Sequence, residues 1–379
     1  GSNALTASIN IITRAPFLMR GKYLRATGGS LDTKNAMARW GGAVAGWDVS
    51  LTAQHRSDDG FDNINDDKDL TDLRLRGDYQ ASGTDSWSVQ LGLTDGATGA
   101  DGRRGDPGNP ARDRELRSHY QQLTWNRVLP DASRHRVNLV HQYDDRDDRY
   151  NLDLAALGFP GFYLPLGPYT SNSQRFDVEY QHTLAPRDHW RLAWGVGLRH
   201  DILSSDLLLG DRDRVGRSSA RVFASFEWMP VDEFLLSLDM LTEWHDDYVT
   251  RNSPRIGLTW LPTMGRSFRA IASRSYRVQG LLERFADARL LVQPGDTYIG
   301  TAFSTFGNDE PEPERLTVYE LGYGEKWQAV DLALDVRVFR EEFRDMGNDV
   351  RRPAGPGEVR DPFVWSDRTG GWDIDGVEV

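Results

Sequence analysis

The stretch that decides the fold is Trp190-Arg191-Leu192-Ala193-Trp194-Gly195-Val196-Gly197-Leu198-Arg199, in which large apolar residues alternate with small or charged ones. A period of two places every second side chain on the same face of an extended strand. The same alternation returns at 47–54, 87–93 and 330–338, whereas helical periodicity is scarce. The chain is therefore predicted to be all-β.

Strand length and loop rhythm narrow the fold class further. About sixteen strands can be read from the alternation, and many are longer than the five or six residues usual in soluble sheets, as a tilted bilayer span requires. A plan with short turns on one rim and long loops on the other is that of a transmembrane antiparallel β-barrel. Short turns are expected near 43–46, 81–85, 129–133, 185–188, 229–233, 261–266 and 325–329, and longer segments near 56–69, 95–114, 145–172, 203–217, 244–253, 275–313 and 343–371.

Tryptophan placement supports the same interpretation. Eight of the 12 Trp residues lie beside the short turns: Trp40, Trp47, Trp87, Trp125, Trp190, Trp228, Trp260 and Trp327. An indole has an apolar body and one N–H donor, so it prefers the headgroup level of a bilayer, and one rim becomes a candidate aromatic girdle. A soluble sandwich also alternates, and it stays open as an alternative that would need no detergent.

Composition excludes several function classes. The 379 residues carry a net charge of −12 and no cysteine. Without cysteine there is no disulfide framework, thiolate zinc site or cysteine nucleophile, and an acidic chain is a poor nucleic-acid binder. The first residues show no signal-peptide pattern, and the chain stops at Val379 within an alternating run. We expect it to be a fragment of something longer.

Two stretches resemble a known family. Residues 1–14, Gly-Ser-Asn-Ala-Leu-Thr-Ala-Ser-Ile-Asn-Ile-Ile-Thr-Arg, are similar to the last plug segment of TonB-dependent outer-membrane receptors. Residues 307–315, Gly-Asn-Asp-Glu-Pro-Glu-Pro-Glu-Arg, with Tyr-Glu-Leu-Gly-Tyr at 319–323, resemble the family's run into a late barrel strand, although Asp309 and Pro311-Glu312 depart from it. Residues 254–260 and 273–277 resemble the same region of the barrel.

The resemblance implies a domain plan and a function. Residues 1–16 would be the C-terminal end of a plug domain, and residues 17–379 a partial outer-membrane β-barrel whose C-terminal strands are missing, since large barrels of this class have 22 strands. The implied function is energised uptake across the outer membrane of a Gram-negative bacterium, with no enzyme activity and no cofactor. The partners implied are TonB, through a plug segment absent from this sequence, together with outer-membrane lipid and lipopolysaccharide, but no nucleic acid.

The ligand stays open at this stage. A ferric siderophore is the commonest ligand that the resemblance implies, with cobalamin, haem or glycans as rivals. A passive porin-like channel is the alternative function, although a porin would need no plug remnant at 1–14. Aromatic and arginine side chains of the long segments suit an anionic chelate, or else pack the loops together. The candidates are Arg103, Arg104, Phe159, Phe162, Tyr163, Tyr169, Arg212, Arg214, Tyr298, Phe303 and Phe306.

Metal and catalytic constellations find little support. None of the eight His residues has metal-ligand spacing, and no nucleophile elbow or phosphate loop is present. His245-Asp246-Asp247 is a minor option for a loop metal contact. Residues 58–69 form an oxygen-rich loop without the spacing of an EF-hand, so a solvated acidic loop is favoured and calcium stays open. Residues 144–149, Asp-Asp-Arg-Asp-Asp-Arg, predict an exposed mixed-charge strand tip or a site for cation-bridged lipopolysaccharide.

Overall fold

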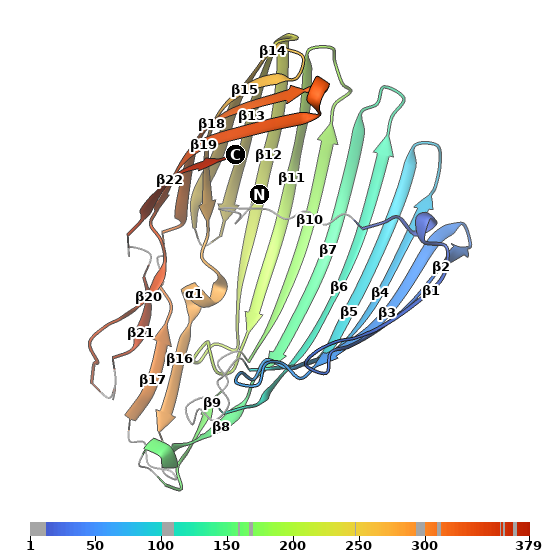
Figure 1. Ribbon diagram of the computed structural model, residues 1–379. Coiled ribbons are helices and arrows are strands. Elements are labelled where there is room, and N and C mark those ends of the chain that lie inside the picture. Colours follow the sequence, from blue (N-terminus) through green and yellow to red (C-terminus); the bar gives the residue numbers. More distant parts are fainter. Residues whose placement is uncertain are drawn as a thin grey trace.

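One large sheet dominates the protein. The computed structural model describes residues 13–100, 110–157, 160–166, 170–246, 248–292, 300–308, 312–356, 358, 361–366 and 370–379. Sixteen strands form an antiparallel sheet in which each strand pairs with the next sheet strand along the chain (Figure 1). They are β1 (Gly21–Gly28), β2 (Lys34–Val44), β3 (Trp47–Asp58), β4 (Lys68–Gln80), β5 (Asp85–Gly99), β6 (Asp113–Val128), β7 (Arg134–Asp147), β10 (Ser171–Thr183), β11 (Trp190–Ser204), β12 (Arg214–Val231), β13 (Phe234–His245), β14 (Tyr248–Thr263), β15 (Arg266–Arg277), β18 (Glu314–Trp327), β19 (Leu332–Arg344) and β22 (Trp372–Glu378).

The remaining elements are short and belong to the long connections. A pair of strands, β8 (Tyr150–Asp153) and β9 (Tyr163–Leu166), forms a small hairpin that is joined by η2 (Leu154–Leu157). A four-stranded sheet, here called the loop sheet, consists of β16 (Asp287–Val292), β17 (Gly300–Phe306), β21 (Phe363–Ser366) and β20 (Asn348–Arg351). The helices are η1 (Pro16–Met19), α1 (Leu281–Phe285) and η3 (Gln328–Val330). In the described part of the chain, no helix is long and apolar enough to cross a bilayer.

The rhythm of the connections confirms the predicted rims. One rim, the short-turn rim, holds tight connections, and the opposite long-loop rim carries the hairpin, α1 and the loop sheet (Figure 1). At the β2–β3 turn both central residues have positive φ, 49° at Ala45 and 84° at Gly46, as a two-residue hairpin turn requires. The short connections are 45–46, 81–84, 129–133, 184–189, 232–233, 264–265 and 328–331.

One predicted loop is wrong. The segment 244–253 was expected to be a long connection, but β13 continues to His245 and β14 begins at Tyr248. Aromatic and β-branched residues such as Tyr248, Val249 and Thr250 favour extended backbone. The two strands therefore extend past the rim as a hairpin, and little loop remains there.

The two faces of the sheet differ in chemistry. On β11, Val196 and Leu198 are exposed on the outward face, and the Leu198 side chain has 63% of its surface accessible. The alternate residues of that strand, Gly195 and Gly197, are buried on the concave face. Exposed apolar side chains recur along neighbouring strands on the outward face, so this face suits a lipid environment.

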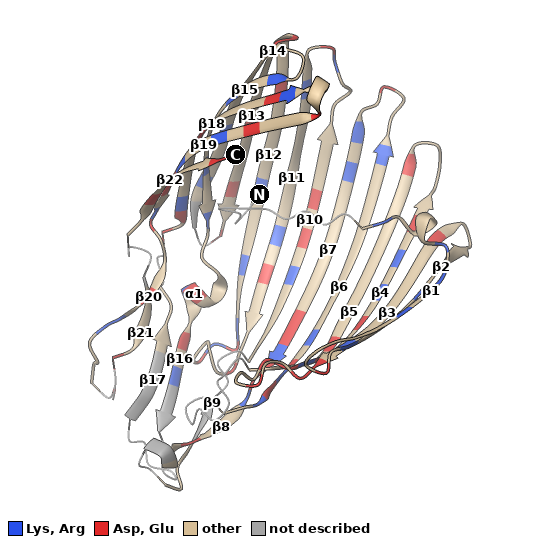
Figure 2. Ribbon diagram, viewed as in Figure 1, with Lys and Arg blue, Asp and Glu red and all other residues tan. Residues whose placement is uncertain are grey.

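Charged side chains gather on the concave face instead, and Figure 2 shows them as bands across β7, β10, β11 and β12. Asp177 of β10 accepts hydrogen bonds from Arg199 of β11 at 2.9 Å and from Arg221 of β12 at 2.9 Å. Arg221 also donates to Glu179 at 2.7 Å. These half-buried ions are paired across three neighbouring strands, so the concave wall carries polar surface at limited cost in desolvation.

Tryptophans lie at the short-turn rim as the sequence predicted. Trp87 and Trp125 have ring centroids 6.4 Å apart, and the Trp125 indole donates to Asp85 at 3.0 Å. Arg127 also binds Asp85, with its Nε at 2.8 Å, and this hydrogen bond does most to hold the pKa of Asp85 well below its ordinary value, assisted by Thr84. The carboxylate therefore stays charged and pins the turn next to the aromatic ring.

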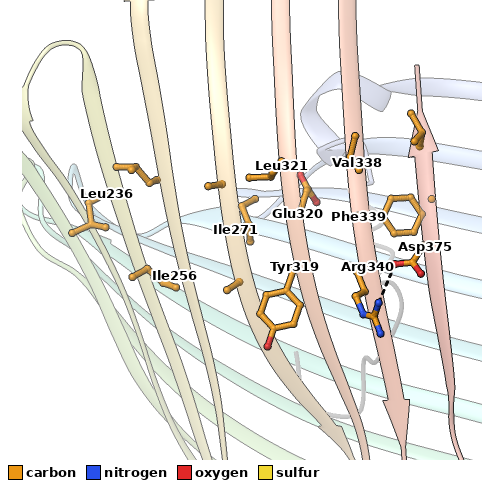
Figure 3. A pocket seen from close by; sticks show the side chains of 15 residues that line it. Leu236, Ile256, Ile271, Tyr319, Glu320, Leu321, Val338, Phe339, Arg340 and Asp375 are labelled. Carbon is orange, nitrogen blue, oxygen red and sulfur yellow. Dashed lines mark ion pairs between the residues drawn. The ribbon is translucent and has the colours of Figure 1, made fainter.

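A hollow on the sheet near its C-terminal edge has a mostly apolar lining. It measures about 930 Å³ and is lined by Leu236, Ile256, Tyr319, Leu321 and neighbouring side chains of β13 to β22 (Figure 3). One ion pair lies at its edge. A ligand pocket needs several convergent polar groups to fix orientation, but the charged groups in this lining are engaged in ion pairs, Arg340 with Asp375 and Glu320 with Arg337. We therefore look for the functional site at the long-loop rim.

Candidate functional site

The long loops are tied together by a buried ion pair. Asp148, whose side chain is fully buried, accepts from Arg112 Nε at 2.7 Å and from Arg112 Nη2 at 3.0 Å. Asn65 donates to the Arg112 carbonyl at 2.5 Å, and Thr170 accepts from the Asp148 backbone N–H at 3.1 Å. Ser205 donates to the Thr170 carbonyl at 2.7 Å. This Arg112 node therefore joins four connections that are far apart in sequence.

A second node joins the later loops. Glu314 at the start of β18 accepts from Arg277 at 2.6 and 2.7 Å and from the Gly347 backbone N–H at 3.1 Å, while Glu283 of α1 lies 3.1 Å from the same guanidinium. Burial opposes ionisation of Glu314, but the hydrogen bonds from Arg277 and Gly347 outweigh it and hold its pKa below the ordinary value. The Glu314 node thus fixes α1 and the start of β18 in one arrangement.

The loop sheet is anchored to this rim. The Asp287 backbone N–H donates to the Leu208 carbonyl at 2.9 Å, which fastens β16 to the β11–β12 connection. Strand β17 pairs antiparallel with β16 and parallel with β21, where Phe306 lies opposite Val364. Strand β9 also contacts β16. The three longest connections therefore meet beside the loop sheet.

Phe306 has two guanidinium groups close to its ring. The Cζ atoms of Arg289 and Arg352 are 5.4 and 5.3 Å from the centroid of its ring. Arg289 is paired with Asp287 at 2.7 Å and Arg352 with Glu358 at 2.8 Å. The Arg352 hydrogen bond does most to hold the pKa of Glu358 below its ordinary value. We call these five residues the Phe306 cluster.

The Phe306 cluster presents two partly exposed guanidinium groups, each paired with a carboxylate, beside an aromatic ring. Each guanidinium has five N–H donors, and the side chains of Arg289 and Arg352 remain 58% and 42% exposed. Fork-shaped donors next to an aromatic face suit a planar, negatively charged ligand, because hydrogen bonding and stacking can act together. The carboxylates of Asp287 and Glu358 preset the orientation of both guanidinium groups.

The predicted ligand residues lie in different places in the structure. Phe306 belongs to the Phe306 cluster. Arg212 lies over Phe285 at 5.6 Å, and Arg214 is exposed at the start of β12. Phe303 lies on β17, with its backbone opposite Leu290 of β16. The remaining candidates Arg103, Arg104, Phe159, Tyr169 and Tyr298 lie outside the described residues.

Phe162 and Tyr163 are adjacent in the hairpin of β8 and β9, but their side chains have different environments. Phe162 packs against Leu152 and Leu154, and its carbonyl accepts from the Leu154 N–H at 2.9 Å. Tyr163 is instead 62% exposed. Phe162 thus takes the loop-packing role that was the alternative for these aromatics, while Tyr163 remains available at the surface.

Carboxylates of the acidic 58–69 loop bind groups within the protein. In the 58–69 loop, Asp58 accepts from the Gly60 N–H at 3.2 Å and pairs with Lys68 at 2.6 Å, and Asp66 accepts from the Phe61 N–H at 2.8 Å. These carboxylates hold a turn in which Gly60 has a φ of 65°. No group of three His, Asp or Glu side chains suited to a metal gathers within the described ranges.

The segment 144–149 differs from its prediction. It was expected to form an exposed mixed-charge tip, but Asp148 is buried against Arg112. Asp147 and Arg149 do remain at the surface, where their side chains lie 3.5 Å apart. Asp148 can be buried because Arg112, which comes from another loop, supplies the counter-charge that a buried carboxylate requires.

Sequence reasoning missed Arg289 and Arg352. Neither stands out by motif, because each is one of many arginines beside a carboxylate. The only local signal was the Asp287-Ala288-Arg289 alternation, which places both charges on the same side of a strand. The contact with Phe306 depends on strand pairing between segments that lie far apart in the chain.

Comparison with known proteins agrees with this architecture. The family model described as TonB dependent receptor-like, beta-barrel matches residues 20–379. The chain therefore belongs to the TonB-dependent receptor β-barrel family, as the resemblance at 307–323 indicated. Members of this family are receptors of the Gram-negative outer membrane. No curated protein matches the sequence.

Several solved structures share the fold. The siderophore receptor PirA from Pseudomonas aeruginosa superimposes with a TM-score of 0.68 at 12% identity, over 94% of this chain and 61% of that one. The ferric enterobactin receptor PfeA from Pseudomonas aeruginosa, in complex with enterobactin, gives 0.70 at 11% over 94% and 59%. The FpvAI–pyocin S2 complex gives 0.65 at 10% over 94% and 51%. The chain thus spans between about half and six-tenths of their length.

Proposed function

We propose that this chain is part of the barrel of an energised outer-membrane importer whose ligand is a ferric siderophore. Support comes from the family, from the similar structures of siderophore receptors, and above all from the Phe306 cluster. An aromatic ring with two partly exposed guanidinium groups beside it fits an anionic chelate with planar iron-binding groups. The long-loop rim would then face the cell exterior, and the Trp-lined rim the periplasm.

The domain plan is part of the same proposal. Residues 1–16 would end the plug, and residues 17–379 would form the barrel, which agrees with a family match that begins at residue 20. Energy would arrive through TonB acting on the plug. The outward face would contact lipid and lipopolysaccharide. Binding and gated passage require no bond to be made or broken, so no residue is assigned a catalytic role.

Ligand binding tests the proposal directly. The purified chain, in detergent, is titrated with a ferric tris-catecholate and a ferric tris-hydroxamate while tryptophan fluorescence is followed. We expect saturable quenching that weakens roughly 10- to 100-fold in the Arg289→Gln/Arg352→Gln double variant, because each lost charged hydrogen bond is worth about 1.5–3 kcal/mol at most and part is retained. Arg187→Gln, on the short-turn rim, is the matched control and should bind as the wild type does.

Uptake separates the rival functions. Cells that lack the gene for this chain should lose uptake of the radiolabelled chelate, and uptake in the parent strain should stop when the proton-motive force is collapsed. Uptake that persists without a proton-motive force would support the porin-like channel. Binding of cobalamin, haem or a glycan in place of both iron chelates would overturn the choice of ligand but leave the receptor class intact.

A further inference from the structure

Residues 13–20 lead into the large sheet at β1. Strand β1 is the first strand in the sheet order, and among the described residues it pairs with β2 alone, from Gly21 opposite Gly41 to Gly28 opposite Lys34. All eight of its residues are exposed. A force on the chain before Gly21 would therefore break the hydrogen bonds between β1 and β2 one residue pair at a time, starting with Gly21 and Gly41.

The preceding segment is fastened to the concave wall well away from β1. Arg76 on β4 donates through Nη1 to the Thr13 hydroxyl at 2.8 Å, with longer contacts of 3.4 Å to the carbonyls of Thr13 and Arg14. Arg76 is itself held by Asp78, at 3.1 Å from Nε and 2.9 Å from Nη2, and Ser88 donates to Asp78 at 2.7 Å. The guanidinium is thus fixed in place before it meets the segment.

A second contact lies at the other end of the segment. The Met19 carbonyl lies directly against Gly41, where an added Cβ would come within 2.1 Å of that oxygen. Pro16 is fully buried, and η1 packs against β2, β3 and β4. Arg20 pairs with Asp48 of β3 at 2.6 Å. Residues 13–20 therefore form a strap that is seated at both ends on three strands.

We propose that this strap is a mechanical anchor, which protects β1 from force that is applied to the preceding part of the chain. A force on the chain before residue 13 would reach Arg76 first and pass into β4, which is bonded to β3 on one side and to β5 on the other. The load would then spread through the interior of the sheet instead of peeling β1 from its edge. The anchor gains its purpose from the proposed energised uptake, in which the chain before the barrel is moved, but its mechanics require no ligand.

Force spectroscopy tests the anchor without reference to transport. The full chain in a lipid bilayer is pulled from Gly1, and the extension released at each rupture is recorded. We expect a first rupture that releases only the strap, followed by peeling of β1. In Arg76→Gln the first rupture should need a lower force, whereas the matched control Arg74→Gln should keep the wild-type force, because Arg74 is 60% exposed and has a 3.7 Å contact with Asp72. An unchanged first rupture in Arg76→Gln would overturn the proposal.

Strap mobility provides an independent readout. The chain has no cysteine, so Leu18→Cys, at a side chain that is 64% exposed, gives a single site for a spin label. We expect the label to be immobile in the wild-type background and to become mobile with either Arg76→Gln or Thr13→Val. The double variant should add little to either single change, because the two side chains form one contact. Equal immobility in all backgrounds would contradict the anchor even if binding of the iron chelate were confirmed.

Discussion

Asp148 shows how one partner decides the fate of a charged residue. Its neighbourhood of alternating Asp and Arg residues is typical of a solvated strand tip, yet its side chain is fully buried. The reason is Arg112, which approaches from the preceding long connection with two hydrogen bonds. A buried carboxylate is tolerated only with such a partner, and removal of one member of a buried pair is costly.

The first residue-scale prediction follows from this pair. In Asp148→Asn the buried Arg112 loses its counter-charge while the side chain keeps its shape. We expect the local free energy of opening of the long loops to fall by roughly 3–5 kcal/mol. Hydrogen exchange of the backbone amides at 61–67 and 148–153 measures this change. Asp69→Asn, at a side chain of the same rim that is 68% exposed, is the control and should leave the exchange rates near those of the wild type.

Glu314 gives a prediction about acid. Its pKa in the folded protein lies below the ordinary value of 4.5, since the hydrogen bonds from Arg277 outweigh its burial. The ionised carboxylate therefore stabilises the loops fully above pH 4.5, and this stabilisation is lost as the pH falls through the lower folded-state pKa. We expect the loop segment 278–292 to be cleaved faster by an acid-active protease as the pH is lowered across that range.

A neutral variant provides the check on this sign. Glu314→Gln should open the same segment already at neutral pH and should show little further change in acid. Glu312→Gln, two residues away at a side chain that is 55% exposed, should follow the wild-type profile. If cleavage of the wild-type segment did not depend on pH, the Glu314 node would not be what holds the loops.

At the scale of elements, the barrel strands were readable from sequence because their environment repeats every two residues. Apolar residues such as Leu198 face outward and small or charged ones such as Gly197 face inward, so alternation marks both the strand and its faces. The sequence does not predict the hairpin of β13 and β14, because the alternation of apolar and polar residues stops where strands extend beyond the apolar band. The polar residues at 244–253 therefore have the pattern of a loop although they form strand ends.

The loop sheet could not be predicted in the same way. Strands β16, β17, β20 and β21 lie inside segments that were read as loops, and β17 pairs in parallel with β21 across a long sequence gap. Such pairing depends on where the barrel strands deliver each loop, and not on local pattern. Phe306 is a ligand candidate by its residue type, but its arginine neighbours come from two separate long connections, Arg289 from β16 and Arg352 from the residue after β20. The sequence therefore suggested the chemistry of the site without its geometry.

The whole molecule separates apolar and charged surface by face. Ion pairs such as Arg221 with Asp177 and Glu179 lie on the concave wall, and further charge lies at the long-loop rim (Figure 2). The outward face presents exposed leucine, valine and tryptophan side chains across the sheet. This division explains how an acidic chain can still carry a lipid-compatible surface, because its charges are paired on the wall or placed beyond the apolar band.

That division leads to a prediction about the whole barrel. Leu198 lies near the middle of β11 on the outward face, where it is 63% exposed. A lysine there would meet the centre of the apolar band, so Leu198→Lys should lower the free energy of unfolding from a bilayer by roughly 2–4 kcal/mol. Gln142→Lys places the same charge on the concave face of β7, beside Asp144, and should cost little. Denaturant unfolding in lipid vesicles, followed by tryptophan fluorescence, compares the two variants. An equal loss of stability in both would mean that the outward face of the sheet does not contact lipid, and the assignment of its two faces would have to be reversed or abandoned.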